Sequence, residues 1–308
     1  MLKKNSYIFF IILVLLGVLV FNALKTFDTS IIERKLVYKP GKETFKLIPE
    51  LASKAKYGSF LSSDKTLLTY YEIKGDKKSP VIVFCHGNAG NMTRNDNQNK
   101  IKFLVKQGYE VFIFDYRGFG KSSGEPDEKG LYRDLDSFVS FLNSRYKIPD
   151  DKIVLWGHSM GSAVVIEEAS KRNFEGVIVE GAFTSIEDMK NYRISHKRNA
   201  DPVHLFVRDY IFNHLPITQK LSSKDKIAKI KSPMLIIHSI KDEMIPVEMG
   251  EKLAKLKPDA QTYFSKTGTH CGYGRQDKVI LEFLNKLSQS AVSENNKKLY
   301  KIEQPSLS

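Results

Sequence analysis

The chain has 308 residues, a formal net charge of +13 and a hydrophobic fraction of 42%, as expected of a globular protein with one large or two small α/β domains. Its lysines are scattered rather than concentrated in a basic block, which argues against nucleic-acid binding and indicates a solvated surface with, at most, weak attraction to anionic lipid headgroups. Two cysteines are too few for a disulfide framework and lack metal-ligand spacing, so a hydrophobic core must hold the fold.

An uncharged segment, residues 7–24, follows a short basic stretch, residues 1–6. It is just long enough to cross a bilayer core as a helix, and it lacks the short apolar centre and small-residue cleavage site of a signal peptide. Lys3 and Lys4 favour a cytoplasmic N-terminus, although Lys25 on the other flank weakens the asymmetry. We therefore expect an uncleaved signal anchor and a single-pass membrane protein whose main domain lies outside the cytoplasm.

Residues 25–54 form a charged connector with Pro and Gly, after which a β-type alternation begins. The segments 55–60 and 66–73 predict the two arms of a hairpin turned at residues 63–65, with both strands antiparallel and at the edge of a sheet.

From Val81 onward, apolar strands alternate with amphipathic helices. Uniformly apolar strands need cover on both sides, so the pattern predicts an α/β fold: a mostly parallel sheet of about eight strands with helices on both faces. The expected strands are 81–84, 111–114, 153–156, 177–179, 234–238 and 261–264, and the expected helices are 94–107, 128–145, the segment after 159, 247–256 and 277–287.

Residues 184–233 interrupt this rhythm and are rich in Arg, His and aromatic residues. An insertion between late strands of such a sheet predicts a small cap over the functional site. From residue 288 the sequence loses apolar periodicity and becomes rich in Ser, Asn and Lys, so we expect 288–308 to be a disordered tail. The main domain would then span 55–287.

The segment 157–161 reads Gly-His-Ser-Met-Gly and lies between an apolar run and a small-residue helical pattern. A strand, a very tight turn and a helix in this order predict a nucleophile elbow with Ser159 at its apex in a strained backbone conformation. Both flanking glycines are needed because a larger side chain would collide with the neighbouring strand and helix. Ser159 is therefore the predicted nucleophile, and a buried turn serine is the alternative.

A serine hydroxyl needs a general base in hydrogen-bond reach, and the base needs an acid to hold its tautomer. With a nucleophile elbow, the partners follow in the order serine, acid, histidine. Asp242 lies in the loop after the strand that ends at His238 and is the predicted acid, with Glu243 as its competitor. His270 lies between the last strand and the last helix and is the predicted base.

The oxyanion formed on attack needs two aimed N–H donors. One is the backbone N–H of Met160, and the other should come from the loop 86–91, which reads His-Gly-Asn-Ala-Gly-Asn. Its glycines let the backbone approach closely, and Asn88 is placed to supply its N–H, the alternative being an ordinary turn. Cys85 and Cys271 adjoin two of these loops, and we do not expect a disulfide between them.

The remaining histidines have weaker predictions. His158 is expected to pack under the elbow, whereas His196, His204 and His214 fall in the cap, where solvated loop positions are expected. Neither H-E-x-x-H nor H-x-x-E-H occurs, so the sequence predicts no catalytic metal and no cofactor.

With these residues in place, the chain resembles the α/β-hydrolase superfamily from about residue 57 to residue 287. More narrowly, it is similar to membrane-anchored serine hydrolases with an H-G-N-x-G-N oxyanion loop. Three loops match in order: 86–91, 115–122 (Asp-Tyr-Arg-Gly-Phe-Gly-Lys-Ser) and 157–161.

The resemblance implies a triad of Ser159, Asp242 and His270 and an oxyanion hole formed by Asn88 and Met160. Two departures bear on substrate shape: the family's frequent His-Gly before the acid is His-Ser at 238–239, and its frequent His-Asn is His-Cys at 270–271.

The resemblance also implies hydrolysis of carboxylic esters, thioesters or sometimes peptides, on an acyl-containing small molecule, lipid or acyl-protein. The alternatives are a serine aminopeptidase-like peptidase and a non-catalytic, membrane-anchored binding protein, which would be expected to lack a triad member. A haloalkane or epoxide hydrolase would need a carboxylate at position 159. The sequence does not determine the oligomeric state.

Overall fold

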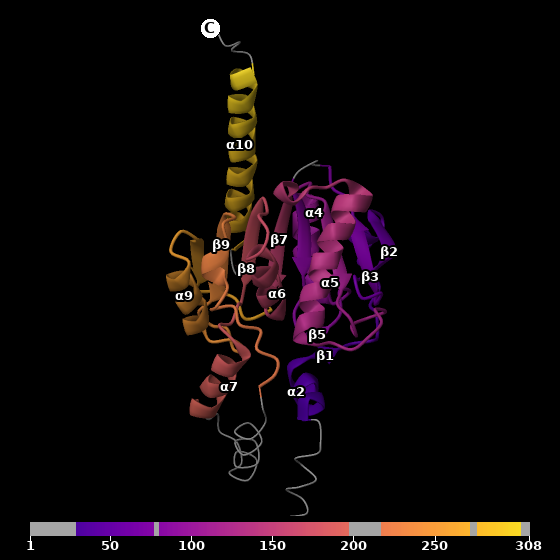
Figure 1. Cartoon of the computed structure of the whole chain (residues 1–308), viewed down its shortest axis with the longest axis vertical. Coiled ribbons are helices and arrows are strands. Elements are labelled where there is room, and N and C mark those ends of the chain that lie inside the picture. The colour runs from indigo at the N-terminus through magenta and orange to yellow at the C-terminus, as the bar shows by residue number, and fades with distance from the viewer. Residues whose placement is uncertain (1–28, 77–79, 197–216, 272–275, 303–308) are drawn as a thin grey trace, which may run out of the picture.

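The computed structural model describes residues 29–76, 80–196, 217–271 and 276–302. Its central feature is an eight-stranded sheet in the order β10-β9-β8-β7-β4-β6-β3-β2, with helices on both faces (Figure 1). The six strands β4, β6, β7, β8, β9 and β10 pair in parallel, whereas β3 pairs antiparallel with both of its neighbours, β6 and β2. The predicted fold class is confirmed.

The main sheet consists of β2 (Ala55–Leu61), β3 (Leu67–Ile73), β4 (Val81–Cys85), β6 (Val111–Asp115), β7 (Ile153–His158), β8 (Gly176–Glu180), β9 (Met234–Ser239) and β10 (Gln261–Ser265). Two short strands, β1 (Lys39–Pro40) and β5 (Ala89–Gly90), pair with each other. The helices are α2 (Thr29–Val37), α3 (Pro49–Ala52), α4 (Asn95–Lys106), α5 (Glu128–Phe141), which continues as a π-helix (Leu142–Tyr146), α6 (Met160–Ala169), α7 (Ile186–Ser195), α9 (Val247–Leu256) and α10 (Gln276–Ile302). Short 3-10 turns occur at Asp150–Lys152 and Ile227–Lys229.

The core lies on both faces of the sheet because successive side chains of a strand point to opposite sides. Val83 and Leu155 pack in a cluster with side chains of α5, α6 and α9. Their neighbours Phe84 and Trp156 pack in a second cluster with side chains of α4 and α10. Helices therefore shield both faces of the sheet from water, which explains why the central strands are apolar at every position instead of alternating.

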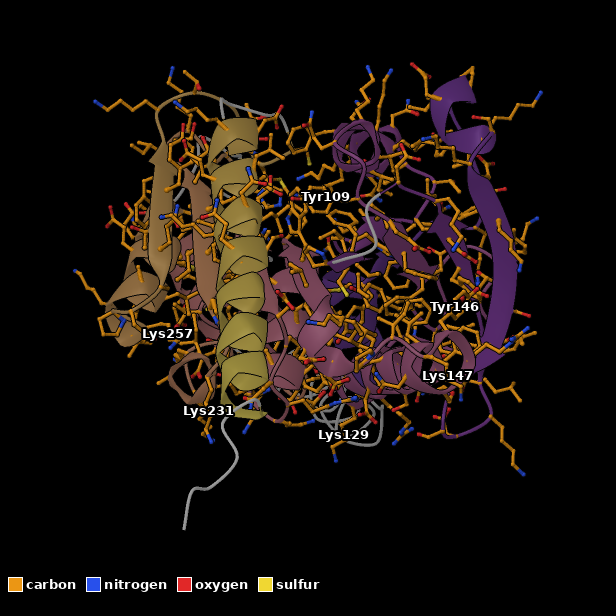
Figure 2. All side chains as sticks on the ribbon, turned by 90° about the horizontal axis from the view of Figure 1, so that it is seen from above. Tyr109, Lys129, Tyr146, Lys147, Lys231 and Lys257 are labelled. Carbon is orange, nitrogen blue, oxygen red and sulfur yellow. The ribbon has the colours of Figure 1, made fainter. Side chains whose placement is uncertain are left out.

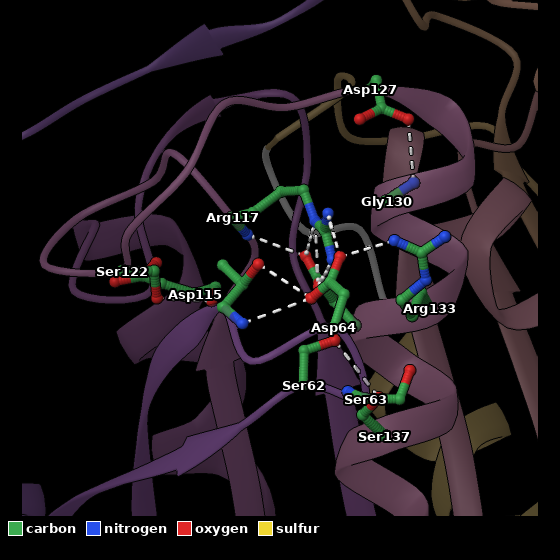
Figure 3. A network of polar contacts seen from close by, with 12 residues as sticks. Ser62, Ser63, Asp64, Asp115, Arg117, Ser122, Asp127, Gly130, Arg133 and Ser137 are labelled. Atoms are coloured by element: carbon green, nitrogen blue, oxygen red, sulfur yellow. Dashed lines mark hydrogen bonds and ion pairs between the residues drawn. The ribbon is translucent and has the colours of Figure 1, made fainter.

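The predicted hairpin is present. Of its two strands, β2 lies at an edge of the sheet and β3 does not, because β3 lies between β2 and β6. Its turn is fixed by charge (Figure 3): the Asp64 carboxylate accepts a hydrogen bond from Arg117, which follows β6, at 2.9 Å, and another from Arg133 of α5. Arg117 also donates to the buried Asp134 of α5 at 2.7 Å. The network joins the hairpin to the loop 115–122.

The exposed lysines Lys129, Lys147 and Lys231 lie at separate places on the periphery (Figure 2). The predicted anchor, residues 7–24, lies outside the described residues. Within the described ranges, no helix combines the length and apolar character needed to span a membrane.

The connector differs from expectation because it is folded onto the domain. It contains α2, β1 and α3, and its Lys39 N–H donates to the Asn88 carbonyl at 2.9 Å, while Gly41 N–H donates to the Gly90 carbonyl at 2.7 Å. A two-residue pairing with a loop about 50 positions away leaves no periodic signal, so the sequence could not indicate it.

The predicted disordered tail is wrong for residues 288–302, because α10 continues through them to Ile302. This stretch contains neither Pro nor Gly, and its three Lys residues with one each of Ala, Leu, Gln and Glu favour a helix. The loss of apolar periodicity therefore does not mark the end of the helix. The last residues, 303–308, lie outside the described ranges.

Candidate active site

The predicted site residues gather at one edge of the sheet, where the carboxyl ends of the parallel strands meet. Asn88 follows β4, Ser159 follows β7, Asp242 follows β9 and His270 follows β10. β4 pairs with β7, β9 pairs with β10, and β8 joins the two pairs, so the loops that follow these parallel strands converge on one place.

The strand-to-helix turn at Ser159 has the geometry expected of a nucleophile elbow. Ser159 has φ 55° and ψ −121°, and its N–H donates to the Glu180 carbonyl at 2.8 Å. A Cβ at Gly157 would lie 2.4 Å from the Gly161 carbonyl oxygen, and one at Gly161 would lie 2.0 Å from that of Cys85. Only glycine fits at these two positions, because the backbones of the neighbouring segments approach so closely there. This close packing on both sides of Ser159 holds its backbone in the strained conformation.

The Asp242 carboxylate contacts the His270 ring, with Oδ2 at 2.7 Å from Nδ1. Its other oxygen accepts the backbone N–H groups of Met244 and Ile245, both at 2.8 Å. Burial alone would raise the pKa of Asp242, but hydrogen bonds from His238 and His270 outweigh it and hold the pKa well below its usual range. The carboxylate is therefore ionised and can hold the His270 ring in the tautomer with hydrogen on Nδ1.

Glu243, the competing carboxylate, accepts the backbone N–H of His270 at 3.1 Å. Of the two acidic residues, Asp242 is the one that contacts the ring. Ser159 and His270 line the same pocket and are both mostly buried, at 8% and 7% exposed. Within the described residues no hydrogen bond joins their side chains, and such contacts often tighten only with substrate bound.

Two further residues that the sequence did not single out for this role hold His270 in place. Gly181, directly after β8, has φ +57°, and a Cβ there would lie 3.1 Å from the His270 Cε1 and 3.4 Å from the Asp242 Oδ2. His158, in the elbow, donates from Nε2 to the His270 carbonyl at 2.9 Å. Burial, with the charge of nearby Lys100, holds the pKa of His158 well below its ordinary value, so it donates as a neutral ring.

The loop 86–91 packs directly on the elbow, since a Cβ at Gly87 would lie 3.5 Å from the Ser159 Cβ. Asn88 is anchored through its side chain, which donates to the Val37 carbonyl of α2 at 2.9 Å. Met160 is the first residue of α6, so its N–H points outward from a helix N-terminus. Among the described residues, no protein group accepts the backbone N–H of Asn88 or Met160.

A buried pair supports this loop from below. His86 is fully buried and donates from Nδ1 to the Gly87 carbonyl at 2.8 Å, with its Nε2 3.3 Å from the Asp115 Oδ1. Asp115 also accepts the Met92 N–H at 2.6 Å. A Cβ at Gly120 would lie 2.0 Å from the Asp115 Oδ2, which accounts for a glycine in the loop 115–122.

The pocket at Ser159 and His270 has a volume of about 240 Å³. Its other lining residues are apolar or cationic: Leu36, Val37, Phe183, Ile186, Met189, Met244, Ile245, Lys39, Lys190 and Arg193. The walls come from α2 and from α7, which is the first helix of the predicted cap. Cap residues 197–216 lie outside the described ranges.

The α2 wall is fixed by one buried carboxylate. Glu33 is 6% exposed and accepts the backbone N–H groups of Thr218 and Gln219 at 2.8 and 2.9 Å, together with the Thr218 hydroxyl. The connector is thereby joined to the later part of the cap, and its α2 residues Leu36 and Val37 line the pocket.

The remaining candidates lie apart from this chemistry or outside the described residues. His196 is exposed, and His204 and His214 are not described. Cys85 is a buried free thiol and Cys271 an exposed one. Across the described ranges, no three or more His, Cys, Asp or Glu side chains gather in a way that could hold a metal ion.

The chain has the fold of the α/β-hydrolases, and part of it matches known proteins of that superfamily. A family model described as "Serine aminopeptidase, S33" matches residues 76–226, a range that includes Ser159 but ends before Asp242 and His270.

Among curated proteins, the chain is 32% identical over 204 residues to the lysophosphatidylserine lipase ABHD12 of Xenopus tropicalis, covering 63% of this chain and 51% of that protein. It is 31% identical over 185 residues to the uncharacterized protein YfhR of Escherichia coli, covering 59% of each. The match thus spans between half and three fifths of these relatives.

Solved structures share the fold. The Pyrococcus furiosus esterase Pf2001 superposes with a TM-score of 0.64 at 20% identity, covering 82% of this chain and 98% of that one. An α/β-hydrolase from Vibrio vulnificus gives a TM-score of 0.67 at 18% identity, covering 85% and 94%.

Proposed function

We propose that this protein is a serine hydrolase that cleaves an acyl ester or thioester through an acyl-enzyme intermediate. The observation that carries the proposal is the pairing of a strained elbow serine with a histidine in one pocket, the histidine ring contacting an ionised carboxylate at 2.7 Å. Esterase and lipase relatives support the same class of reaction.

In this mechanism the Ser159 Oγ attacks the substrate carbonyl carbon while its proton passes to the His270 Nε2. Asp242 keeps its contact with the Nδ1–H and stabilises the imidazolium. The charge that develops on the carbonyl oxygen is met by the N–H groups of Asn88 and Met160. His270 then protonates the leaving group, whose bond to the carbonyl carbon breaks to leave the acyl-enzyme. Water attacks the acyl-enzyme carbonyl carbon while His270 takes its proton, and the bond to the Ser159 Oγ breaks as His270 returns that proton to the serine.

The pocket lining favours an acyl group over a peptide N-terminus. An aminopeptidase has to recognise a protonated amine, and no Asp or Glu occurs among the described residues that line the pocket. The lining instead combines apolar side chains, such as Phe183 and Met189, with the cations Lys39, Lys190 and Arg193. We therefore favour an ester or thioester over the peptidase named in the family description, and the ABHD12 relative, a lysophosphatidylserine lipase, favours a lipid as the acyl donor.

We also propose that residues 7–24 anchor the protein in a membrane, with the hydrolase domain outside the cytoplasm. The support is the uncharged sequence of this segment, preceded by Lys3 and Lys4. Protease added to intact spheroplasts should degrade the domain from Tyr57 onward, and protection of the whole domain would contradict this orientation. Release by a carbonate wash would contradict the anchor.

Labelling with a fluorophosphonate probe tests the chemistry without a known substrate, because the probe reacts only with a serine activated by a base and an oxyanion hole. We expect a single labelled residue, lost in Ser159→Ala and strongly reduced in His270→Ala, whereas the matched control Ser170→Ala, at the end of α6, should label normally. A folded wild-type protein that resists the probe and leaves p-nitrophenyl esters and acyl thioesters uncleaved would instead indicate a binding protein.

A further inference from the structure

An exposed apolar strip leads from the outer face of α2 into the active-site pocket. Ile32 and Leu36 are four residues apart and therefore lie on the same side of the helix, and they are 37% and 46% exposed. Leu36 lines the pocket, as does Met244, which is 50% exposed in the loop after β9. The apolar interior of the pocket thus continues onto the surface on two sides.

Cationic side chains accompany this strip. Lys39 follows α2, and Lys190 and Arg193 lie on α7, all three among the residues that line the pocket. Apolar side chains beside lysine and arginine match the boundary of a bilayer, where acyl chains lie beneath anionic phosphates.

The length of chain before α2 limits where this surface can lie. The predicted span ends at residue 24 and α2 begins at Thr29, so fully extended chain between them reaches at most about 18 Å. Figure 1 shows α2 and α7 at the same end of the molecule, with α10 extending from the opposite end. The pocket mouth is therefore kept close to the bilayer in which the span would be inserted.

We propose that the surface formed by Ile32, Leu36, Met244, Lys39, Lys190 and Arg193 docks on the lipid bilayer, so that an acyl chain enters the pocket directly from the membrane. The proposal rests on the membrane anchor of the proposed function. It makes the enzyme's substrate an acyl lipid resident in that bilayer rather than a dissolved ester. The apolar side chains would enter the headgroup boundary, and the cations would face the lipid phosphates.

The test uses the full chain inserted into phosphatidylcholine–phosphatidylglycerol vesicles whose acyl chains are brominated, because bromine quenches a nearby tryptophan. Ile32→Trp places the probe on the docking surface. Leu256→Trp is the matched control, since Leu256 is 39% exposed at the end of α9, beside the amino ends of β9 and β10. The native Trp156 is fully buried and contributes equally to both variants.

We expect the protein to resist carbonate extraction and the emission of Ile32→Trp to fall in brominated vesicles relative to unbrominated ones, with little change for Leu256→Trp. Equal emission changes in the two inserted variants would overturn the docking proposal while leaving the anchor intact. Release of the protein by carbonate would overturn both the anchor and the docking. Fluorophosphonate labelling of Ser159 is independent of either result, so a failure of the hydrolase chemistry is recognised separately.

Discussion

Replacing Asp242 with Asn tests the proposed triad at its most clearly defined contact. The Asp242 Oδ1 accepts two backbone N–H groups, from Met244 and Ile245, so an Asn must place its carbonyl oxygen there. Its NH₂ then faces the His270 Nδ1 across 2.7 Å and donates to it, which moves the ring proton to Nε2. A ring protonated on Nε2 cannot accept the Ser159 proton. We expect kcat to fall roughly 10⁴-fold, equivalent to about 5 kcal/mol in the barrier.

The assay is steady-state hydrolysis of a p-nitrophenyl acyl ester, with thermal unfolding to confirm that Asp242→Asn is folded. Glu243→Gln is the matched control, because a Gln at 243 can still accept the His270 N–H, and its activity should stay near the wild-type value. An inactive Glu243→Gln with a fully active Asp242→Asn would show that the acid is wrongly assigned.

Most of the fold could be predicted from the sequence because the buried parallel strands carry a local signal. The helix expected at 247–256 has the observed bounds, and the expected strands begin within one residue of those in the structure. Features that depend on distant partners were not predictable. The position of β3 between two strands is set by its pairing with β6. The continuation of α10 past residue 287 was missed for a different reason: the end of an apolar periodicity does not end a helix whose residues still favour helix formation.

The candidate site divides in the same way. Ser159, Asp242 and His270 could be predicted because each lies in a recognisable loop after a strand, and the structure brings the last two into contact. Gly181 was missed because a single glycine after a strand resembles any turn glycine. Its function appears only when the His270 ring is placed beside it. The α2 wall was missed for a similar reason, since its Glu33 contacts a segment 185 residues away.

Three further changes have defined expectations. Burial raises the pKa of Glu168 from 4.5 to about 7, so its carboxyl destabilises the folded state progressively between these pH values, by about 3 kcal/mol above pH 7. Glu168→Gln should therefore raise the free energy of urea unfolding at pH 8 and change it little at pH 4, and an equal effect at both would contradict the assignment. Glu33→Ala leaves two buried N–H groups without their acceptor, which costs roughly 1–3 kcal/mol for each group. The variant should therefore have a lower melting temperature and a higher KM for the ester. An unchanged KM would show that the position of α2 does not affect substrate binding. Gly181→Ala puts a methyl group 3.1 Å from the His270 ring at a backbone φ that costs alanine roughly 1–2 kcal/mol. The ring has to shift by a few tenths of an ångström relative to the elbow, so kcat should fall roughly tenfold while the protein stays folded. A wild-type kcat in that variant would mean that His270 has freedom the packing around Gly181 does not suggest.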